Sequence, residues 1–384
     1  MQEFHIKTPE QLLNLCDRIR GDRWLALDTE FMREKTYHPK FCLLQLCNGE
    51  IAASIDPLTL ENLDPLLEII YDPAILKVWH SARQDLEIFH HLWKKPPSPL
   101  FDTQLAATLL GLGDQVGYGN LVGSVLGHNL DKGHTRTDWS FRPLEESQLR
   151  YALDDVIYLG ELYLNLDRRL RDLQRDQWLE DDFAALTDPS TYINVPEDAW
   201  QRIKGRQKLK GVQLAVLQSL ASWRETRAIQ ANRPRRWILK DEIMVELARR
   251  QPRNTDGLDR IRGLEGGTLK RHGNELLELI GAAARLPKSQ WPGEENLPPR
   301  LSPNQDAQVD LLMCSLRLLA EKNQITPTAI CNRKELEALV VGVRDLDLLH
   351  GWRRALAGET LLQVLEGKHA PSMENGHLTL TGLP

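Results

Sequence analysis

Every stretch of this chain that has the pattern of a β-strand lies in its first 102 residues. The stretches are short apolar runs, and helical periodicity fills the intervals between most of them. Asn48-Gly49 separates two of the runs and predicts a tight hairpin. The predicted strands are 24–31, 41–47, 51–56, 75–79 and a short strand that ends at 102. This alternation predicts an α/β domain built on a mixed five-stranded sheet with helices on both faces.

After residue 187 the chain shows helical patterns, and two of its stretches resemble each other. Gln213 and Gln308, 95 positions apart, each open a helix that is followed by a Pro-bearing loop. A Leu-rich helix closes each copy, and a segment rich in Pro and Gly separates the copies. We therefore expect two small all-α helical bundles after the sheet domain. The predicted domains are residues 1–187, 206–286 and 303–370.

The composition excludes several classes of protein. At 41% hydrophobic and 27% charged residues the chain is neither disordered nor fibrous. No apolar run approaches the roughly 18 residues that span a bilayer, and the first residues lack the pattern of a secretory signal. The five cysteines are scattered without Cys-x-x-Cys spacing, so we expect free thiols in a reducing compartment. These features predict a cytoplasmic protein that does not contact a membrane.

Charge is distributed unevenly along the chain. Residues 201–290 contain 20 Lys and Arg against 9 Asp and Glu, a net charge of +11, whereas residues 1–200 carry −14 and residues 291–384 carry −3. An acidic first half followed by a basic block predicts that one part of the molecule holds cations and another holds a polyanion. Chance variation of the surface charge is the alternative explanation.

Four acidic residues and one tyrosine are the candidates for chemistry. Asp28 and Glu30 lie two residues apart in an apolar strand, so both carboxylates point to one face of that strand. Asp85 falls in the first turn of a helix, and Tyr151 and Asp155 lie one turn apart on one helix face. Each alone has a simpler explanation, such as a solvated acid or an acid favoured by a helix dipole. The combination in this order is much more specific.

This order resembles the DEDD exonuclease superfamily in its tyrosine-bearing subclass. That pattern has Asp-x-Glu in the first strand, an acid after the fourth strand and Tyr-x-x-x-Asp in a late helix. Further segments are similar to the ribonuclease D family, namely His80-Ser-Ala-Arg-Gln-Asp85, Arg136-Thr-Asp-Trp-Ser, Arg142-Pro-Leu and Tyr151-Ala-Leu-Asp-Asp155. The resemblance covers nearly the whole chain. It implies a ribonuclease H-like sheet domain followed by two helicase-and-RNase-D C-terminal (HRDC-like) modules.

The activity implied by the resemblance is that of a 3′-5′ exoribonuclease. Such an enzyme releases 5′-mononucleotides from RNA 3′ ends, and trimming of transfer-RNA precursors is the role that the family implies. Clustered carboxylates would repel one another and take up protons unless cations intervened. Oxygen ligands suit Mg²⁺ or Mn²⁺. Two such ions about 4 Å apart can activate a water and stabilise the leaving oxygen of a phosphodiester.

We therefore predict a role for each candidate residue. Asp28 bridges the two ions, Glu30 and Asp155 bind the ion that holds the attacking water, and Asp85 belongs to the shell of the second ion. By the resemblance, Tyr151 orients the water through a hydrogen bond. A tyrosine has an ordinary pKa of about 10 and is a poor general base on its own, so the metal has to supply most of the activation.

Other functions fit parts of the pattern. A DNA-directed 3′-5′ exonuclease would carry the same acids, and no residue here reads a ribose 2′-hydroxyl, so the preference for RNA rests on the resemblance. A non-catalytic RNA-binding scaffold is disfavoured because all five positions of the catalytic pattern are intact. The chain contains no Gly-x-x-x-x-Gly-Lys-Ser/Thr loop, so we expect no nucleoside triphosphate as a partner.

The basic block contains the candidates for RNA binding. Arg233, Arg235 and Arg236 stand next to Trp237, and an arginine beside a tryptophan can pair with phosphates and offer a stacking face. The alternative is that Trp237 belongs to the core and the arginines are solvated. The second helical repeat is acidic, which favours a structural or partner-binding role for it.

Overall fold

The computed structural model describes residues 1–130, 133, 137–293 and 301–382, and the chain divides into two compact units. The sheet unit consists of Met1–Glu30, Cys42–Thr191 and Arg300–Pro384, and the helical unit consists of Phe31–Phe41 and Tyr192–Pro299. Arg136, from one of the sequence motifs, and positions 294–299 of the predicted linker lie outside the described residues.

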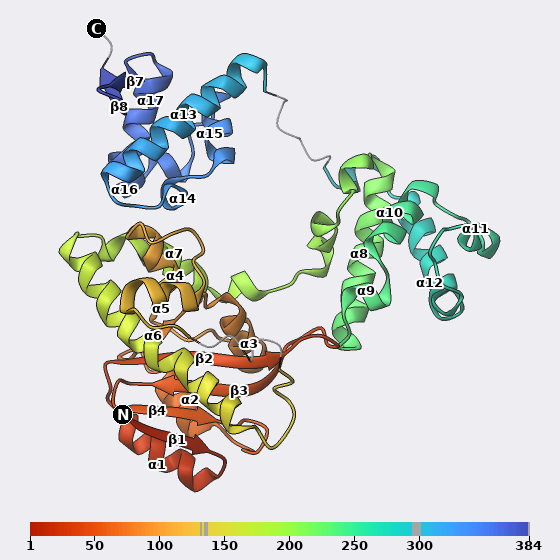
Figure 1. Cartoon of the computed structure of the whole chain (residues 1–384). Helices are drawn as coiled ribbons and strands as arrows, with labels where there is room; N and C mark the ends of the chain where they lie inside the picture. The colour runs from red at the N-terminus through yellow and green to blue at the C-terminus, as the bar shows by residue number, and fades with distance from the viewer. Residues whose placement is uncertain (131–132, 134–136, 294–300, 383–384) are drawn as a thin grey trace. The chain divides into compact units, whose positions relative to one another are not determined.

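A six-stranded sheet forms the centre of the sheet unit (Figure 1). Its strands are β1 (Gln2–Ile6), β2 (Trp24–Met32), β3 (Lys40–Cys47), β4 (Ile51–Ile55), β5 (Leu76–Trp79) and β6 (Leu100–Asp102), in the spatial order β1-β4-β3-β2-β5-β6. β3 and β4 form the predicted hairpin at Asn48-Gly49, where Gly49 has a φ of 96°. All five residues of β4 are buried, which requires cover on both faces of the sheet. The predicted α/β class is confirmed.

The sheet has six strands, one more than the five predicted. The additional strand, β1, pairs in parallel with β4 at one edge of the sheet. Only Ile6 of its five residues is buried, and Gln2 and Glu3 are exposed. A polar edge strand of this kind gives too weak an apolar signal to be read from the sequence.

Helices flank this sheet. Those described up to residue 187 are α1 (Pro9–Ile19), α2 (Asp64–Ile70), α3 (Arg83–Trp93), α4 (Thr103–Leu109), α5 (Tyr118–Leu126), α6 (Glu146–Asp172) and α7 (Glu180–Thr187). The long helix α6 contacts β4 and β5 of the sheet and the helices α4 and α5. This contact fixes the register of α6 against the strands.

The second helical module, defined as the described residues of 301–382, also belongs to the sheet unit. It contains α13 (Pro303–Lys322), α14 (Pro327–Ile330), α15 (Arg333–Val340), α16 (Gly351–Arg353) and α17 (Glu359–Leu365). Its buried leucines form one hydrophobic cluster with those of α4, α5 and α6. The module therefore shares its core with the sheet domain.

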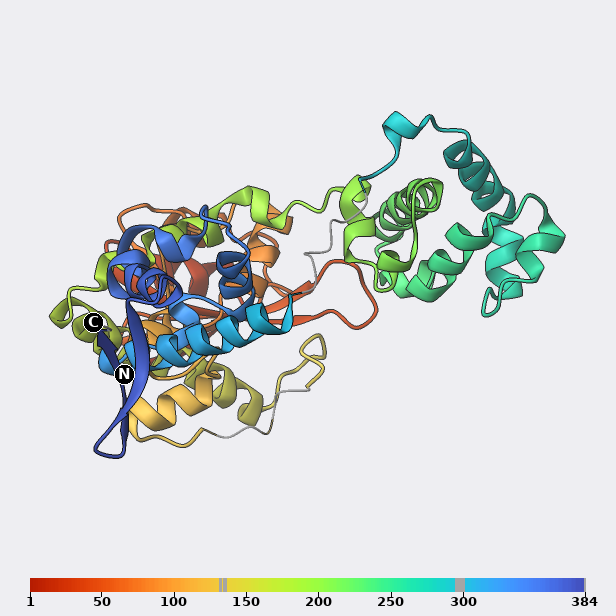
Figure 2. The same ribbon diagram turned by 90° about the horizontal axis from the view of Figure 1, so that it is seen from above.

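A β-hairpin ends the second helical module, so the expectation of no strands after residue 102 is wrong. β7 (His369–Glu374) and β8 (His377–Gly382) pair in antiparallel fashion, and Figure 2 shows them as a two-stranded ribbon leading to the C-terminus. The turn is Asn375-Gly376, with φ angles of 50° and 81°. The sequence contains this Asn-Gly signal, but each strand has only a few apolar residues beside it.

The helical unit contains the first helical module, defined as residues 206–286. Its helices are α8 (Val212–Gln230), α9 (Arg235–Ile238), α10 (Asp241–Arg250), α11 (Thr255–Asp259) and α12 (Gly266–Ala284). They enclose a hydrophobic cluster of their own, together with Ala199, Trp200 and Ile203. The order of long, one-turn and medium helices is the same as in α13, α14 and α15, which supports the predicted duplication.

The structure also bears on the predictions about membranes and cysteines. In the described part of the chain, no helix has the length and apolar character needed to cross a membrane. All five cysteines are free thiols, and four of them are buried.

Candidate active site

The first two acids lie in the middle of the sheet. β2 runs between β3 and β5, and its residues Leu25, Ala26 and Leu27 are completely buried. Asp28 and Glu30 follow in the same strand and are each partly exposed. The buried strand β2 thus places the carboxylates of Asp28 and Glu30 on one face of the sheet, where both are partly accessible to solvent.

The long helix α6 supplies the third acid of the cluster. One oxygen each of Asp28, Glu30 and Asp155 lie within 4.8 Å of one another. Tyr151, one turn before Asp155 on the same helix, forms a hydrogen bond to the Asp155 carboxylate. Strand and helix, about 125 residues apart in the sequence, therefore meet at one cluster of carboxylates.

The fourth acid, Asp85, is nearby but has a different environment. It lies in the first turn of α3, is 7% exposed, and accepts a hydrogen bond from the Thr29 hydroxyl. It is outside the group of three within 4.8 Å, although its charge acts on Asp28. The sequence pattern assigns Thr29 no role, because strand alternation points it away from Asp28 and Glu30.

Asp102 has the capping role typical of an acid at the start of a helix. Its carboxylate accepts hydrogen bonds from the backbone N–H groups of Gln104 and Leu105 at the start of α4. It also accepts from the N–H groups of Ser81 and Ala82, at 3.1 and 2.8 Å, just before α3. Asp102 therefore joins the starts of two helices and holds the segment that carries Asp85.

Burial raises the pKa of all four carboxyl groups, and repulsion by the other acids of the cluster raises the pKa of Asp28 and Glu30 further. The pKa of Glu30 is raised to about 9, by desolvation and by the charges of Asp155 and Asp85. Burial raises the pKa of Asp155 and of Asp85 to about 7 each. The pKa of Asp28 is raised well above its ordinary value by burial and then by the neighbouring carboxylates. Such a cluster is an oxygen-rich site that a divalent cation would stabilise in its ionised form.

Tyr151 remains a neutral hydroxyl. Burial, followed by the charges of Asp155, Glu30 and Asp28, raises its pKa above the ordinary value. The ring of Trp139 lies 6.2 Å from the Tyr151 ring, centroid to centroid, at an interplanar angle of 33°. A neutral phenol beside the carboxylates can donate or accept a hydrogen bond, but it does not act as a base.

The basic residues predicted to bind RNA lie on the helical unit and differ in their surroundings. Arg233 and Arg236 are exposed, and Trp237 is 60% exposed, so it is not a core residue. Arg236 pairs with Glu242 at 3.1 Å on the surface.

Arg235 instead has partners inside the helical unit. Its guanidinium donates two hydrogen bonds of 2.6 Å to the buried Glu225 carboxylate and one of 2.8 Å to the Tyr37 hydroxyl. It also stacks over the Tyr37 ring at 4.6 Å. These contacts give Arg235 a structural role and leave Arg233, Arg236 and Trp237 as the exposed candidates.

Comparison with known proteins relates the chain to nucleases. Residues 4–171 match the family model described as 3′-5′ exonuclease, and residues 213–280 match the HRDC domain. The chain is 40% identical over 381 residues to the ribonuclease D of Sphingobium indicum, covering 98% of each chain. It is 40% identical to the ribonuclease D of Pseudomonas paraeruginosa over 94% of this chain and 97% of that one. The crystal structure of Escherichia coli RNase D superimposes with a TM-score of 0.82 at 32% identity, covering 96% of this chain and 99% of that one.

Proposed function

The chain belongs to the ribonuclease D family of 3′-5′ exoribonucleases, and on that premise we propose that it matures the 3′ ends of transfer-RNA precursors. RNA is its substrate class. The similar Escherichia coli enzyme is described as an exoribonuclease involved in structured RNA processing, which supports a structured RNA as the natural substrate. We propose a cytoplasmic location, which five free thiols support.

The family depends on divalent metal ions, and we propose two ions of Mg²⁺ or Mn²⁺ for each site. The donor set fits them, because Asp28, Glu30 and Asp155 offer carboxylate oxygens within 4.8 Å of one another. Bound there, the ions would activate a water and stabilise the leaving 3′ oxygen. The raised pKa values indicate that these carboxyl groups hold protons which metal binding would displace.

The protein's own residues would position the metal ions and the attacking water. Asp28 would be a ligand of both ions, Glu30 and Asp155 would bind the ion that holds the attacking water, and Asp85 would bind the second ion. The Thr29 hydroxyl donates a hydrogen bond to Asp85 and holds its carboxylate in place. The neutral Tyr151 hydroxyl would orient the attacking water by a hydrogen bond. Burial raises the pKa of this hydroxyl above its ordinary value, which favours the neutral form.

We propose that the first helical module holds the body of the RNA. The net charge of +11 over residues 201–290, which include this module, and the exposed Arg233, Arg236 and Trp237 support this role. The sheet domain at 1–187 would then receive the 3′ tail, and the helical domains would be 206–286 and 303–370. The match of residues 213–280 to the HRDC family supports the first of the two helical domains.

The observation that carries the proposal is the convergence of Asp28, Glu30 and Asp155 beside Tyr151. It is tested by incubating the full chain with a 5′-labelled transfer-RNA precursor and with a DNA of the same sequence. Each is examined with Mg²⁺, with Mn²⁺ and with a chelator, and with a 3′-hydroxyl or a 3′-phosphate. We expect stepwise shortening of the RNA by single nucleotides, only with metal and only from a 3′-hydroxyl.

Two outcomes would contradict this proposal. Faster shortening of the DNA would identify a DNA-directed exonuclease. Binding of the RNA without any shortening, in either metal, would identify a scaffold.

A further inference from the structure

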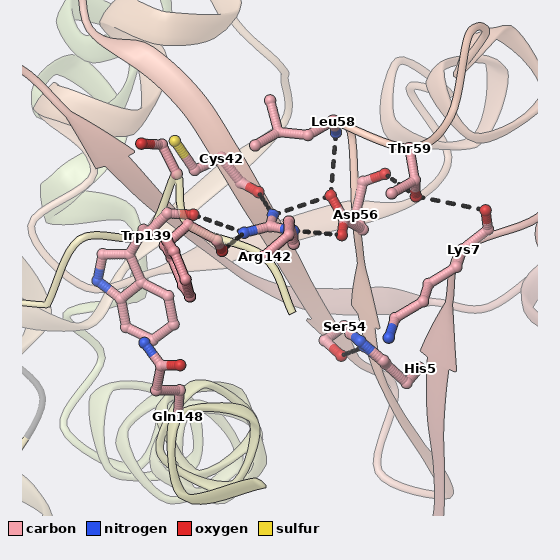
Figure 3. A network of polar contacts seen from close by, with 12 residues as sticks. His5, Lys7, Cys42, Ser54, Asp56, Leu58, Thr59, Trp139, Arg142 and Gln148 are labelled. Atoms are coloured by element: carbon pink, nitrogen blue, oxygen red, sulfur yellow. Dashed lines mark hydrogen bonds and ion pairs between the residues drawn. The ribbon is translucent and has the colours of Figure 1, made fainter. Parts of the chain in front are cut away.

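Arg142, in the loop before α6, has no part in the chemistry proposed above but is held by a dense network of contacts (Figure 3). Its Nε and one Nη donate to the two carboxylate oxygens of Asp56, at 2.6 and 2.9 Å. The same Nη donates to the Cys42 carbonyl at 2.7 Å. The other Nη donates to the carbonyls of Trp139 and Phe141, at 2.7 and 2.8 Å. All five N–H donors of the guanidinium therefore have a partner.

The anchor of this network is buried in the sheet. Asp56 directly follows β4, has no exposed surface, and also accepts a hydrogen bond from the Leu58 backbone N–H at 3.0 Å. Cys42 belongs to β3, the neighbour of β4. Arg142 thus ties the loop 138–142 to two adjacent strands of the sheet.

The loop places one aromatic side chain inward. Trp139 is 3% exposed, and its ring lies 6.2 Å from that of Tyr151. Figure 3 shows Trp139 between Arg142 and Gln148, which lies in the first turn of α6. Because Arg142 holds the Trp139 carbonyl, it fixes the backbone from which this indole packs against Tyr151.

We propose that Arg142 is a positioning residue for the reaction. Its pair with Asp56 fixes Trp139, and Trp139 holds the Tyr151 ring so that the hydroxyl points to Asp155. This inference rests on the proposed function, since it gives Tyr151 the task of orienting the attacking water. It also assigns a task to the Arg142-Pro-Leu motif, which the catalytic pattern leaves without one.

The geometry explains why an arginine stands here. A lysine has three donors on one nitrogen, whereas the planar guanidinium reaches two carboxylate oxygens and three carbonyls in different directions. Arg150, eight residues further along the chain and in the first turns of α6, provides the contrast. It is 43% exposed and pairs with Glu3 and Asp154 on the surface.

A double-mutant cycle in the full-length protein tests the proposal. Arg142→Lys, Tyr151→Phe and the double variant are compared with wild type on a 3′-hydroxyl oligoribonucleotide in Mg²⁺, and Arg150→Gln is the matched control. We expect Arg142→Lys to lower kcat about 10- to 100-fold, as a displacement of about 1 Å near the reacting atoms does, and to leave KM within about twofold. In the Tyr151→Phe background the same change should lower kcat less than about threefold, because its target is gone. Arg150→Gln should leave both constants unchanged.

The possible outcomes distinguish a failure of the positioning role from a failure of the proposed exonuclease function. An active wild type in which the two effects multiply, or in which Arg142→Lys raises KM while kcat holds, would overturn the positioning role and leave the exonuclease intact. A wild type that never shortens RNA would overturn the proposed function itself. If Arg142→Lys lowers the melting temperature too far to be assayed, Trp139→Phe replaces it in the cycle. The effects of Trp139→Phe and Tyr151→Phe on log kcat should likewise be less than additive in the double variant. Additive effects on log kcat would again refute the proposal.

Discussion

The two helical modules share an order of helices but have different partners. The first encloses its own core, with α8, α10 and α12 around Leu217, Met244 and Leu276. The second contributes α13, α15 and α17 to the cluster that also contains residues of α4, α5 and α6. One module is therefore a separate basic body, and the other is an acidic extension of the sheet domain.

Specific contacts fix the second module in the sheet unit. Arg175 is 8% exposed, and its guanidinium donates to the carbonyls of Leu109, at 2.6 Å, and Asn323, at 2.5 Å. Trp178 and Trp352 stack with ring centroids 4.5 Å apart. Similar helices can thus become part of the core of the sheet unit or form a separate module with its own core, depending on which apolar face finds a partner.

The largest expected effect separates catalysis from RNA binding. We predict that Asp28→Asn lowers kcat by on the order of 10³-fold or more, because several kcal/mol of charge stabilisation by metal would be lost. Affinity for a transfer-RNA precursor, measured by filter binding, should remain unchanged, since the basic surface lies on the helical unit. An equal loss of affinity would show that the acidic site, not the basic module, holds the RNA.

The second prediction tests the shared core. We predict that Arg175→Met lowers the free energy of unfolding of the sheet unit by about 3 kcal/mol, because buried carbonyls lose their donor. Chemical denaturation and hydrogen exchange of α13 report the change. Arg250→Met on the first module is the control and should cost less than about 0.5 kcal/mol, since the Arg250 side chain is 55% exposed and pairs with Glu246 one turn away on the same helix. Unchanged exchange in α13 would mean that the second module is as independent as the first.

The third prediction concerns pH. The pKa of Glu30 is raised to about 9 and that of Asp155 to about 7, so the folded, metal-free protein binds protons at pH 7 that the unfolded chain has lost. Stability without metal should therefore fall as the pH rises from about 5 to 9. Apparent Mg²⁺ affinity should rise over the upper part of the same range, with proton release measurable by calorimetry in buffers of different ionisation enthalpy. RNA affinity of the helical unit should not follow this profile, and a flat metal profile would refute the raised values.

The smallest effect is expected on the basic surface. Changing both Arg233 and Arg236 to Ala should weaken binding of a transfer-RNA precursor and flatten the slope of log affinity against log salt by about 1.4, which is about 0.7 for each phosphate that the variant no longer neutralises. Arg333→Ala in the second module is the matched control, because that arginine pairs with Asp306, Asp310 and Glu337. If the double variant keeps the wild-type salt slope, these arginines do not contact RNA phosphates and the basic block is only a solvated surface.

Much of the fold and site followed from local patterns. The apolar runs predicted five strands, and the Asn48-Gly49 turn predicted their hairpin, because a buried strand and a tight turn each require particular residues. The edge strand β1 and the hairpin of β7 and β8 were missed, since partly exposed strands have few apolar residues. The catalytic acids were recognised by their order and by short spacings, two residues in a strand and four in a helix, which are visible in the sequence alone.

The sequence by itself determined the acid pattern, the charge division and the succession of elements, because these depend on residue type and short spacing. Only the tertiary structure decided which of these groups meet. Asp155 lies beside Asp28 and Glu30. Asp85 accepts a hydrogen bond from Thr29, and Arg235 forms an ion pair with the buried Glu225. The tertiary structure also placed the second module in the core of the sheet unit. Such contacts join residues tens to hundreds of positions apart, and they depend on how whole faces pack, which no local pattern specifies.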